Sequence, residues 1–167
     1  MAASQPYIYQ GQDFTLQRDK NRFVLSTLFR STVRASSGGE SILCLAKHDR
    51  WPCLIGFGLS REAEFPRILA EEQALYGKEF DRDTRSFNLY NYTKVPFDGS
   101  GRFVLPEHSA TAAGIGKEVY YQGAGEFFTL WSPEALAGYA AEQPSFAAAN
   151  AVCASLAAKE RAKAKRS

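Results

Sequence analysis

A duplicated tetrapeptide constrains the fold of this chain more than any other feature. The sequence Arg-Phe-Val-Leu occupies residues 22–25 and returns at residues 102–105. Each copy follows a polar turn and precedes a segment rich in small residues, a glycine-containing turn and two further strand-like runs. Four identical residues can arise by chance, but the shared order of turn, strand, short helix, turn, strand and strand is harder to dismiss. The sequence therefore predicts two copies of one β-rich unit.

Local patterns define the elements inside each unit. Residues 13–17 and 91–97 alternate as strands do. The turns that follow contain Asn or Gly, which tolerate positive φ and so close hairpins. Pro106 suits the first turn of a helix, and Ser26, at the equivalent place in the first copy, suits a helix N-cap. We expect each unit to contain more strand than helix, with one short helix.

The segments outside the two units are predicted to be helical. Ser60 can cap a helix with an acidic first turn, and Pro66 either ends that helix or begins the next one. The Ala-rich end from Phe146 onward predicts a marginal helix that needs a surface to pack on. We divide the chain into a first unit at 7–58, a helical connector at 59–90, a second unit at 91–135, and a C-terminal helix with a basic tail at 136–167.

Charge is segregated along the chain although the net charge is only +2. Residues 18–34 contain five basic residues and one acid, whereas residues 62–83 contain seven acids and three basic residues. The last nine residues contain five cations. This pattern favours an anionic partner at the first and last segments. A solvated surface of mixed charge is the alternative.

Composition indicates a globular protein of the cytoplasm. Apolar residues make up 45% and charged residues 23% of the 167 residues, and no apolar run approaches the length of a membrane span. The first residues lack a charged segment followed by an apolar one, so we expect no secretory signal. The three cysteines are odd in number and none are spaced as C-x-x-C, which favours a reducing compartment.

A metal or thiol site is the main rival interpretation. Cys44, His48 and Cys53, with Asp49, have the spacing C-x3-H-x4-C, which matches no common zinc pattern. Cys44 lies in an apolar run, and cysteine is often buried, so a core position is the better prediction. We expect no catalytic residue, metal or cofactor, and a thiol- or zinc-dependent enzyme is the weakest hypothesis.

The second unit carries a family resemblance. The stretch from Asp98 to Pro106, with residues 113–119 and 123–131, resembles the second repeat of MraZ proteins. These are bacterial regulators of the division and cell-wall gene cluster, related to AbrB-type swapped-hairpin barrels. The mark of the family is an Asp-x-x-x-Arg turn followed by an apolar strand and a proline, present twice per chain. Asp98 and Arg102 match this turn, and Pro106 follows.

The first unit departs from the same pattern. Only Arg22 matches, because Arg18 stands where the family has Asp. The resemblance covers residues 7–139 and is strongest in the second half. It implies a mainly β, α+β fold with short helices: a pseudo-two-fold swapped-hairpin (double-split) β-barrel built from both repeats, with a helical connector and tail. It also implies a ring of identical subunits that binds short direct repeats of double-stranded DNA upstream of its own operon.

The candidate DNA-binding residues lie in and just after the first turn. Arg18, Lys20 and Arg22 place cations at a hairpin tip, and a major groove admits a two-stranded ribbon. Lysine mainly neutralises phosphate, whereas arginine can also contact guanine in bidentate fashion. Arg30 follows where the family also has arginine. Asp98 and Arg102 are expected to lock the second turn by a salt bridge, with DNA contact as their second possible role.

Two functions remain open at this stage. The leading hypothesis is a cytoplasmic, nucleoid-associated, sequence-specific DNA-binding regulator, acting as a repressor. The alternative is a ring-forming protein-interaction scaffold with only non-specific DNA binding, suggested by the altered first turn and by the acidic connector, which suits basic protein partners.

Overall fold

The computed structural model describes residues 7–166. Residues 1–6, on which the expectation of no secretory signal rests, and Ser167 lie outside the described part. The first unit contains β1 (Gln12–Leu16), β2 (Arg22–Val24), α1 (Thr27–Ser36), β3 (Ile42–Lys47) and β4 (Leu54–Phe57). The second contains β5 (Thr93–Pro96), β6 (Arg102–Val104), α4 (Glu107–Ala113), β7 (Glu118–Gly123) and β8 (Phe128–Trp131). The two units therefore repeat one order of elements, as the duplicated tetrapeptide predicts.

The two units exchange strands in an antiparallel sheet. Six strands lie in the order β1-β7-β8-β4-β3-β5, and β2 pairs separately with β6. Strand β1 of the first unit pairs with β7 of the second, and β5 of the second pairs with β3 of the first. Strands β4 and β8 meet in the middle, where Ile55 faces Thr129. Exchanging the two units reproduces the same pairings, so the molecule has a pseudo-two-fold axis, and the prediction of an α+β fold is confirmed.

Aromatic side chains fill the core between the units. Phe29 of α1 stacks on Phe128 of β8, with ring centroids 4.5 Å apart, and Tyr9 and Tyr121 pack around this pair. All four side chains are almost completely buried. Because these rings come from both units, burial of this apolar surface holds the two copies together.

Each of the two hairpin turns contains one residue with positive φ. Asn21 in the first turn and Gly101 in the second both adopt positive φ, 61° and 82°. Each then accepts a hydrogen bond from the other unit: Leu105 N–H donates to the Asn21 carbonyl oxygen and Leu25 N–H to that of Gly101, both at 2.7 Å. The turns are thereby tied to the opposite strands of the β2–β6 ribbon.

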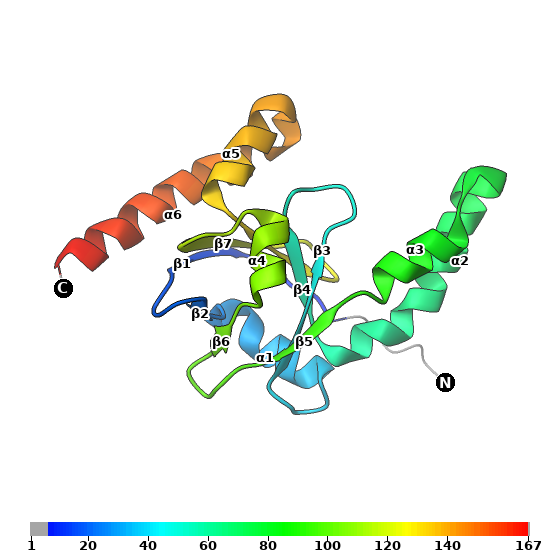
Figure 1. Cartoon of the computed structure of the whole chain (residues 1–167), viewed down its shortest axis with the longest axis horizontal. Coiled ribbons are helices and arrows are strands. Elements are labelled where there is room, and N and C mark those ends of the chain that lie inside the picture. The colour runs from blue at the N-terminus through cyan, green and yellow to red at the C-terminus, as the bar shows by residue number, and fades with distance from the viewer. Residues whose placement is uncertain (1–6, 167) are drawn as a thin grey trace.

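The connector and tail are helical, as predicted, and lie on opposite sides of the body (Figure 1). The connector contains a 3-10 turn (Leu59–Glu64), α2 (Phe65–Tyr76), a second 3-10 turn (Gly77–Glu79) and α3 (Arg82–Leu89). The tail contains α5 (Pro133–Glu142), a 3-10 turn (Pro144–Phe146) and α6 (Ala147–Arg166). Pro66 falls in the first turn of α2, where its missing N–H costs nothing.

The packing of both helical segments follows from their apolar side chains. Phe65, Leu69 and Leu89 anchor the α2–α3 arm against Cys44 and Phe57 of the sheet. On the other side, Trp131 forms a second cluster with residues of α5 and α6. None of the helices in residues 7–166 has the length and apolar character needed to cross a membrane.

Candidate nucleic-acid interface

The β2–β6 ribbon separates its side chains onto two faces. Phe23 and Phe103 stand opposite each other and are buried beneath the ribbon. Arg22 pairs with Val104, and Arg102 with Val24, so these four side chains occupy the outer face. Arg22 and Arg102 are diagonal neighbours, a relation that places Cα atoms about 7–8 Å apart. The ribbon therefore presents two arginines outward on an apolar base.

The first turn exposes its cations without neutralising them. Arg18 N–H donates to the Arg22 carbonyl oxygen at 2.8 Å, and Arg22 N–H donates to that of Asp19 at 2.9 Å. The side chains of Arg18, Lys20 and Arg22 are exposed. Within the described part of the chain, none of these three side chains has a hydrogen bond or an ion pair. Their charges are thus available to an external anion.

The second turn holds its arginine in place. The Asp98 carboxylate accepts hydrogen bonds from the backbone N–H groups of Arg102 and Ser100, each at 2.9 Å, and from Arg102 Nε at 2.7 Å. These hydrogen bonds lower the pKa of Asp98, and those from Arg102 have the largest effect. The salt bridge expected between Asp98 and Arg102 is present, so the two turns differ in free charge although each contains one residue with positive φ, Asn21 or Gly101.

Arg30 lies behind the ribbon and not at its tip. Its Nε donates to the Leu25 carbonyl oxygen at 2.7 Å. The guanidinium covers Gly101 so closely that a Cβ at Gly101 would collide with it. The half-buried Arg30 therefore joins helix α1 to the second turn, a position that the sequence does not indicate.

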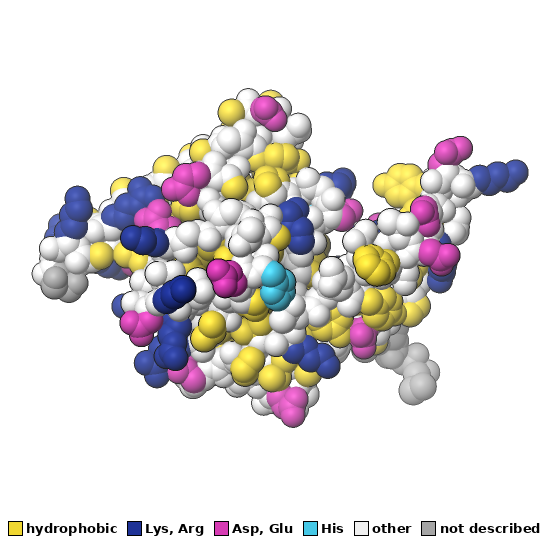
Figure 2. Space-filling model, in the orientation of Figure 1, with side chains coloured by type: hydrophobic (Ala, Val, Ile, Leu, Met, Phe, Trp, Pro, Cys, Tyr) yellow, Lys and Arg dark blue, Asp and Glu magenta, His cyan; other side chains and the backbone are white. Residues whose placement is uncertain are grey.

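The structure brings the last cationic segment beside the first. The end of α6 and the first turn line the two sides of one groove, and Lys and Arg side chains gather at this end of the molecule (Figure 2). The sequence marks both segments as basic but gives no sign that they are neighbours. Their proximity depends on the packing of α6 along β1.

The rival thiol or metal site is not assembled. Cys44 and Cys53 are both buried, but they belong to different apolar clusters. Burial raises the pKa of the Cys44 thiol to about 12, so it stays protonated and unreactive. No group of three or more His, Cys, Asp or Glu residues in positions 7–166 could hold a metal ion.

His48 stabilises the loop between β3 and β4. Its Nδ1 accepts hydrogen bonds from the backbone N–H groups of Arg50 and Trp51, each at 3.0 Å, and its ring stacks on Trp51 with centroids 4.0 Å apart. Burial lowers the pKa of His48 to about 4. The imidazole is therefore neutral at pH 7 and serves as an acceptor in the loop.

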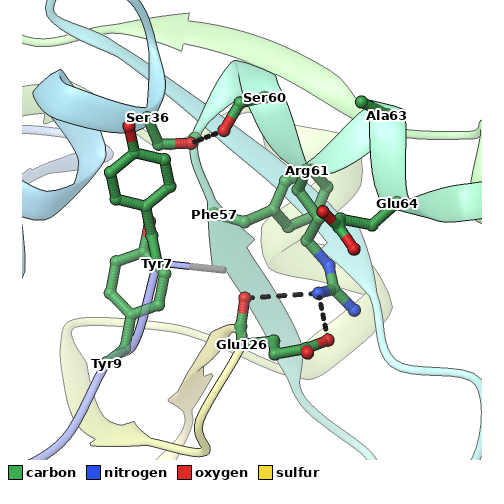
Figure 3. Close-up of a pocket in the computed structure, with 10 residues that line it drawn as sticks. Tyr7, Tyr9, Ser36, Phe57, Ser60, Arg61, Ala63, Glu64 and Glu126 are labelled. Atoms are coloured by element: carbon green, nitrogen blue, oxygen red, sulfur yellow. Dashed lines mark hydrogen bonds and ion pairs between the residues drawn. The ribbon is translucent and has the colours of Figure 1, made fainter. Parts of the chain in front are cut away.

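A small cavity of about 210 Å³ lies at the far end of α1 from the ribbon (Figure 3). Arg61 Nη1 contacts the Glu126 carbonyl oxygen at 3.3 Å and a carboxylate oxygen at 3.4 Å. The Tyr9 hydroxyl and Arg61 Nε are buried there without a partner among the described residues. Among the residues that line this cavity, the Ser36 and Ser60 hydroxyls hydrogen-bond to each other at 2.7 Å, and Arg61 is paired with Glu126. No histidine or cysteine of the described residues lines it to activate either serine.

Fold and surface together define a class: a duplicated hairpin protein with exchanged strands and an exposed cationic β-ribbon. No family model matches the chain. Curated proteins named "Transcriptional regulator MraZ" do align with it. The protein from Parvibaculum lavamentivorans is 30% identical over 123 residues, which are 74% of each chain. The protein from Methylococcus capsulatus is 29% identical over 124 residues, 74% of this chain and 78% of its own.

A third relative agrees with the first two. The Caulobacter vibrioides protein of the same name is 29% identical over 128 residues, 77% of this chain and 79% of its own. These alignments cover about three quarters of the chain, too much for the duplicated tetrapeptide alone to account for. The chain belongs to the MraZ family.

Proposed function

We propose that this protein is a sequence-specific DNA-binding transcriptional regulator that acts as a repressor. Its operator is a set of short direct repeats upstream of its own division and cell-wall operon, and it works in the cytoplasm on the nucleoid. The observation that carries this proposal is the exposed first turn, whose three cations have no partner within residues 7–166. The names of the relatives support the same function.

Each cation of the interface has its own role in this proposal. Arg22, at the base of the outer ribbon face, contacts a guanine edge in the major groove, while Arg18 and Lys20 neutralise phosphates on either side. Arg30 supports the ribbon from behind and adds its charge to the same surface. Arg102 is engaged by Asp98 and makes at most a secondary contact.

The ring assembly is part of the proposal. Four large apolar side chains of the α2–α3 arm are exposed: Leu75 by 74%, Tyr76 by 58%, Phe87 by 75% and Tyr90 by 44%. Several large apolar side chains exposed on one arm are typical of protein interfaces. We assign the connector at 59–90 to subunit contact and the interdigitated units at 7–58 and 91–135 to one DNA-binding module. A ring that presents several ribbons to tandem boxes gains affinity through effective concentration.

The test is a binding titration with two DNA duplexes of equal length. One duplex carries the sequence upstream of the protein's own gene, and the other carries the same bases in shuffled order. The proposal predicts tighter binding to the first duplex, typically by a factor of at least about 10³ for a specific regulator. Equal binding would refute sequence-specific regulation.

Equal binding would favour the second candidate, a ring-forming scaffold that binds DNA without sequence preference. The observation behind this candidate is Arg18, which adds a cation to the first turn and leaves Arg22 without the carboxylate partner that Arg102 has. The exposed acids of the connector would then face basic protein partners.

A further inference from the structure

Helix α6 is fixed to the body of the protein along most of its length. Cys153 and Ala157 are buried against the cluster around Trp131. Further along, the Arg161 guanidinium makes two hydrogen bonds of 2.6 Å to the Glu118 carboxylate at the start of β7. Because a bidentate pair fixes orientation as well as distance, the last turns of α6 hold a defined place beside β1.

That place creates a groove of about 380 Å³ between α6 and the first unit. Arg18 and Arg30 line one side of the groove, and Lys163 lines the other. Two acids also line it, and both are engaged. Asp13 accepts hydrogen bonds from the Ser26 hydroxyl and from Phe14 N–H, each at 2.8 Å, and Glu160 pairs with Lys163 at 3.2 Å.

The C-terminal end of α6 carries more positive charge than the helix dipole alone would favour. Lys159, Lys165 and Arg166 are exposed, and none of the three has a partner within the described residues. One or two cations in the last turn would satisfy the helix dipole. Because Arg161 and Lys163 are each paired with a glutamate, the charge on this segment that has no carboxylate partner among the described residues lies on the other three cations. An external anion would neutralise these three side chains.

We propose that the last two turns of α6 and the first hairpin turn form one continuous surface for the phosphate backbone of double-stranded DNA. The ribbon reads bases, and α6 neutralises phosphates flanking the site. This inference rests on the proposed function and extends it to a segment outside both hairpin units. Because phosphates carry no sequence information, α6 contributes affinity and salt dependence but not preference among sequences.

The test compares a tail variant with a control of equal charge change. The tail variant is Lys159→Gln, Lys165→Gln and Arg166→Gln, which leaves the Arg161–Glu118 anchor intact. The control is Lys47→Gln, Arg50→Gln and Lys94→Gln, three exposed cations on strand β3, in the loop after it and on strand β5, outside both the arm and the candidate DNA surface. Affinity for the upstream duplex is measured by fluorescence anisotropy over a range of salt concentrations, and far-UV circular dichroism compares helix content.

Log K falls as log salt rises, and each lost phosphate contact reduces the steepness of this negative slope by about 0.9. We expect the steepness to fall by about 2–3 in the tail variant and to keep its wild-type value in the control. The affinity of the tail variant should fall equally for upstream and shuffled duplexes. A charge-preserving variant, Lys159→Arg with Lys165→Arg, should keep the wild-type slope. If the tail variant binds DNA with the wild-type slope, the inference is wrong.

The outcome for α6 is separable from the outcome for the proposed function. If the wild-type protein binds both duplexes equally but the tail variant has a less steep salt slope, sequence-specific regulation is refuted and phosphate binding by α6 is supported. If the wild-type protein prefers the upstream duplex and the tail variant keeps the wild-type slope, sequence-specific regulation is supported and phosphate binding by α6 is refuted.

Discussion

Replacing Gly101 by alanine tests how the ribbon is held. Gly101 has a φ of 82°, which costs a residue with a Cβ about 1–2 kcal/mol. The new methyl group would also collide with the Arg30 guanidinium. Displacing Arg30 breaks its 2.7 Å hydrogen bond to the Leu25 carbonyl oxygen, a further loss of about 1–2 kcal/mol for this half-buried group. We expect the free energy of unfolding to fall by about 2–4 kcal/mol in all.

A double-mutant cycle separates the two causes. Urea unfolding is followed for wild type, Gly101→Ala, Arg30→Ala and the double variant at one protein concentration, because assembly also affects stability. In the Arg30→Ala background the Gly101 substitution should cost only its backbone strain, so the coupling is at least about 1 kcal/mol. Gly99→Ala, where a Cβ meets nothing within 4 Å, is the control and should change stability by no more than about 0.5 kcal/mol. Additive effects of the two substitutions would refute the contact between Arg30 and Gly101.

Two further predictions concern His48 and the arm. Burial lowers the pKa of His48 to about 4, so the unfolded chain binds more protons than the folded one between about pH 6.5 and 4. The contribution of neutral His48 to the free energy of unfolding is complete above pH 6.5. This contribution, at most about 3 kcal/mol, is lost as the pH falls toward 4. Urea midpoints should show this loss in the wild type, whereas a loss of equal size in His48→Gln would contradict it. Tyr76→Ser with Phe87→Ser should leave the circular dichroism spectrum unchanged but yield smaller assemblies in sedimentation velocity; assemblies of wild-type size would exclude the arm from subunit contact.

The duplicated unit was predictable because its signals are local. Both copies of Arg-Phe-Val-Leu alternate so that Phe23 and Phe103 turn inward and the arginines turn outward, and a short strand needs no other information to do so. The capping role of Ser26 was predictable for the same reason, since its hydroxyl accepts a hydrogen bond from Leu28 N–H, two residues away. The exchange of strands between the units came from the family resemblance, because no local pattern encodes it.

Long-range contacts explain what the sequence did not indicate. Arg30 meets Gly101 from 71 positions away, so its place behind the ribbon could not be read from its neighbours. The site of α6 depends on the Arg161–Glu118 pair and on one small-residue face that includes Cys153 and Ala157. Helical spacing does not mark that face, because alanine lies on every side of α6 and the helix has almost no amphipathic pattern. The surface on which it packs could not be predicted either, because β1 and β7 come from different units.

The most direct measurement compares Arg22→Ala with Arg102→Ala in binding to the upstream duplex. The two arginines share one face of the ribbon, but Arg102 is held by Asp98, whereas Arg22 has no partner among residues 7–166. We expect Arg22→Ala to weaken binding by about 10- to 100-fold, equivalent to about 1–3 kcal/mol, and to reduce the preference over shuffled DNA. Arg102→Ala should have a much smaller effect. Wild-type affinity in Arg22→Ala would contradict the assignment of the first turn as the DNA-reading element.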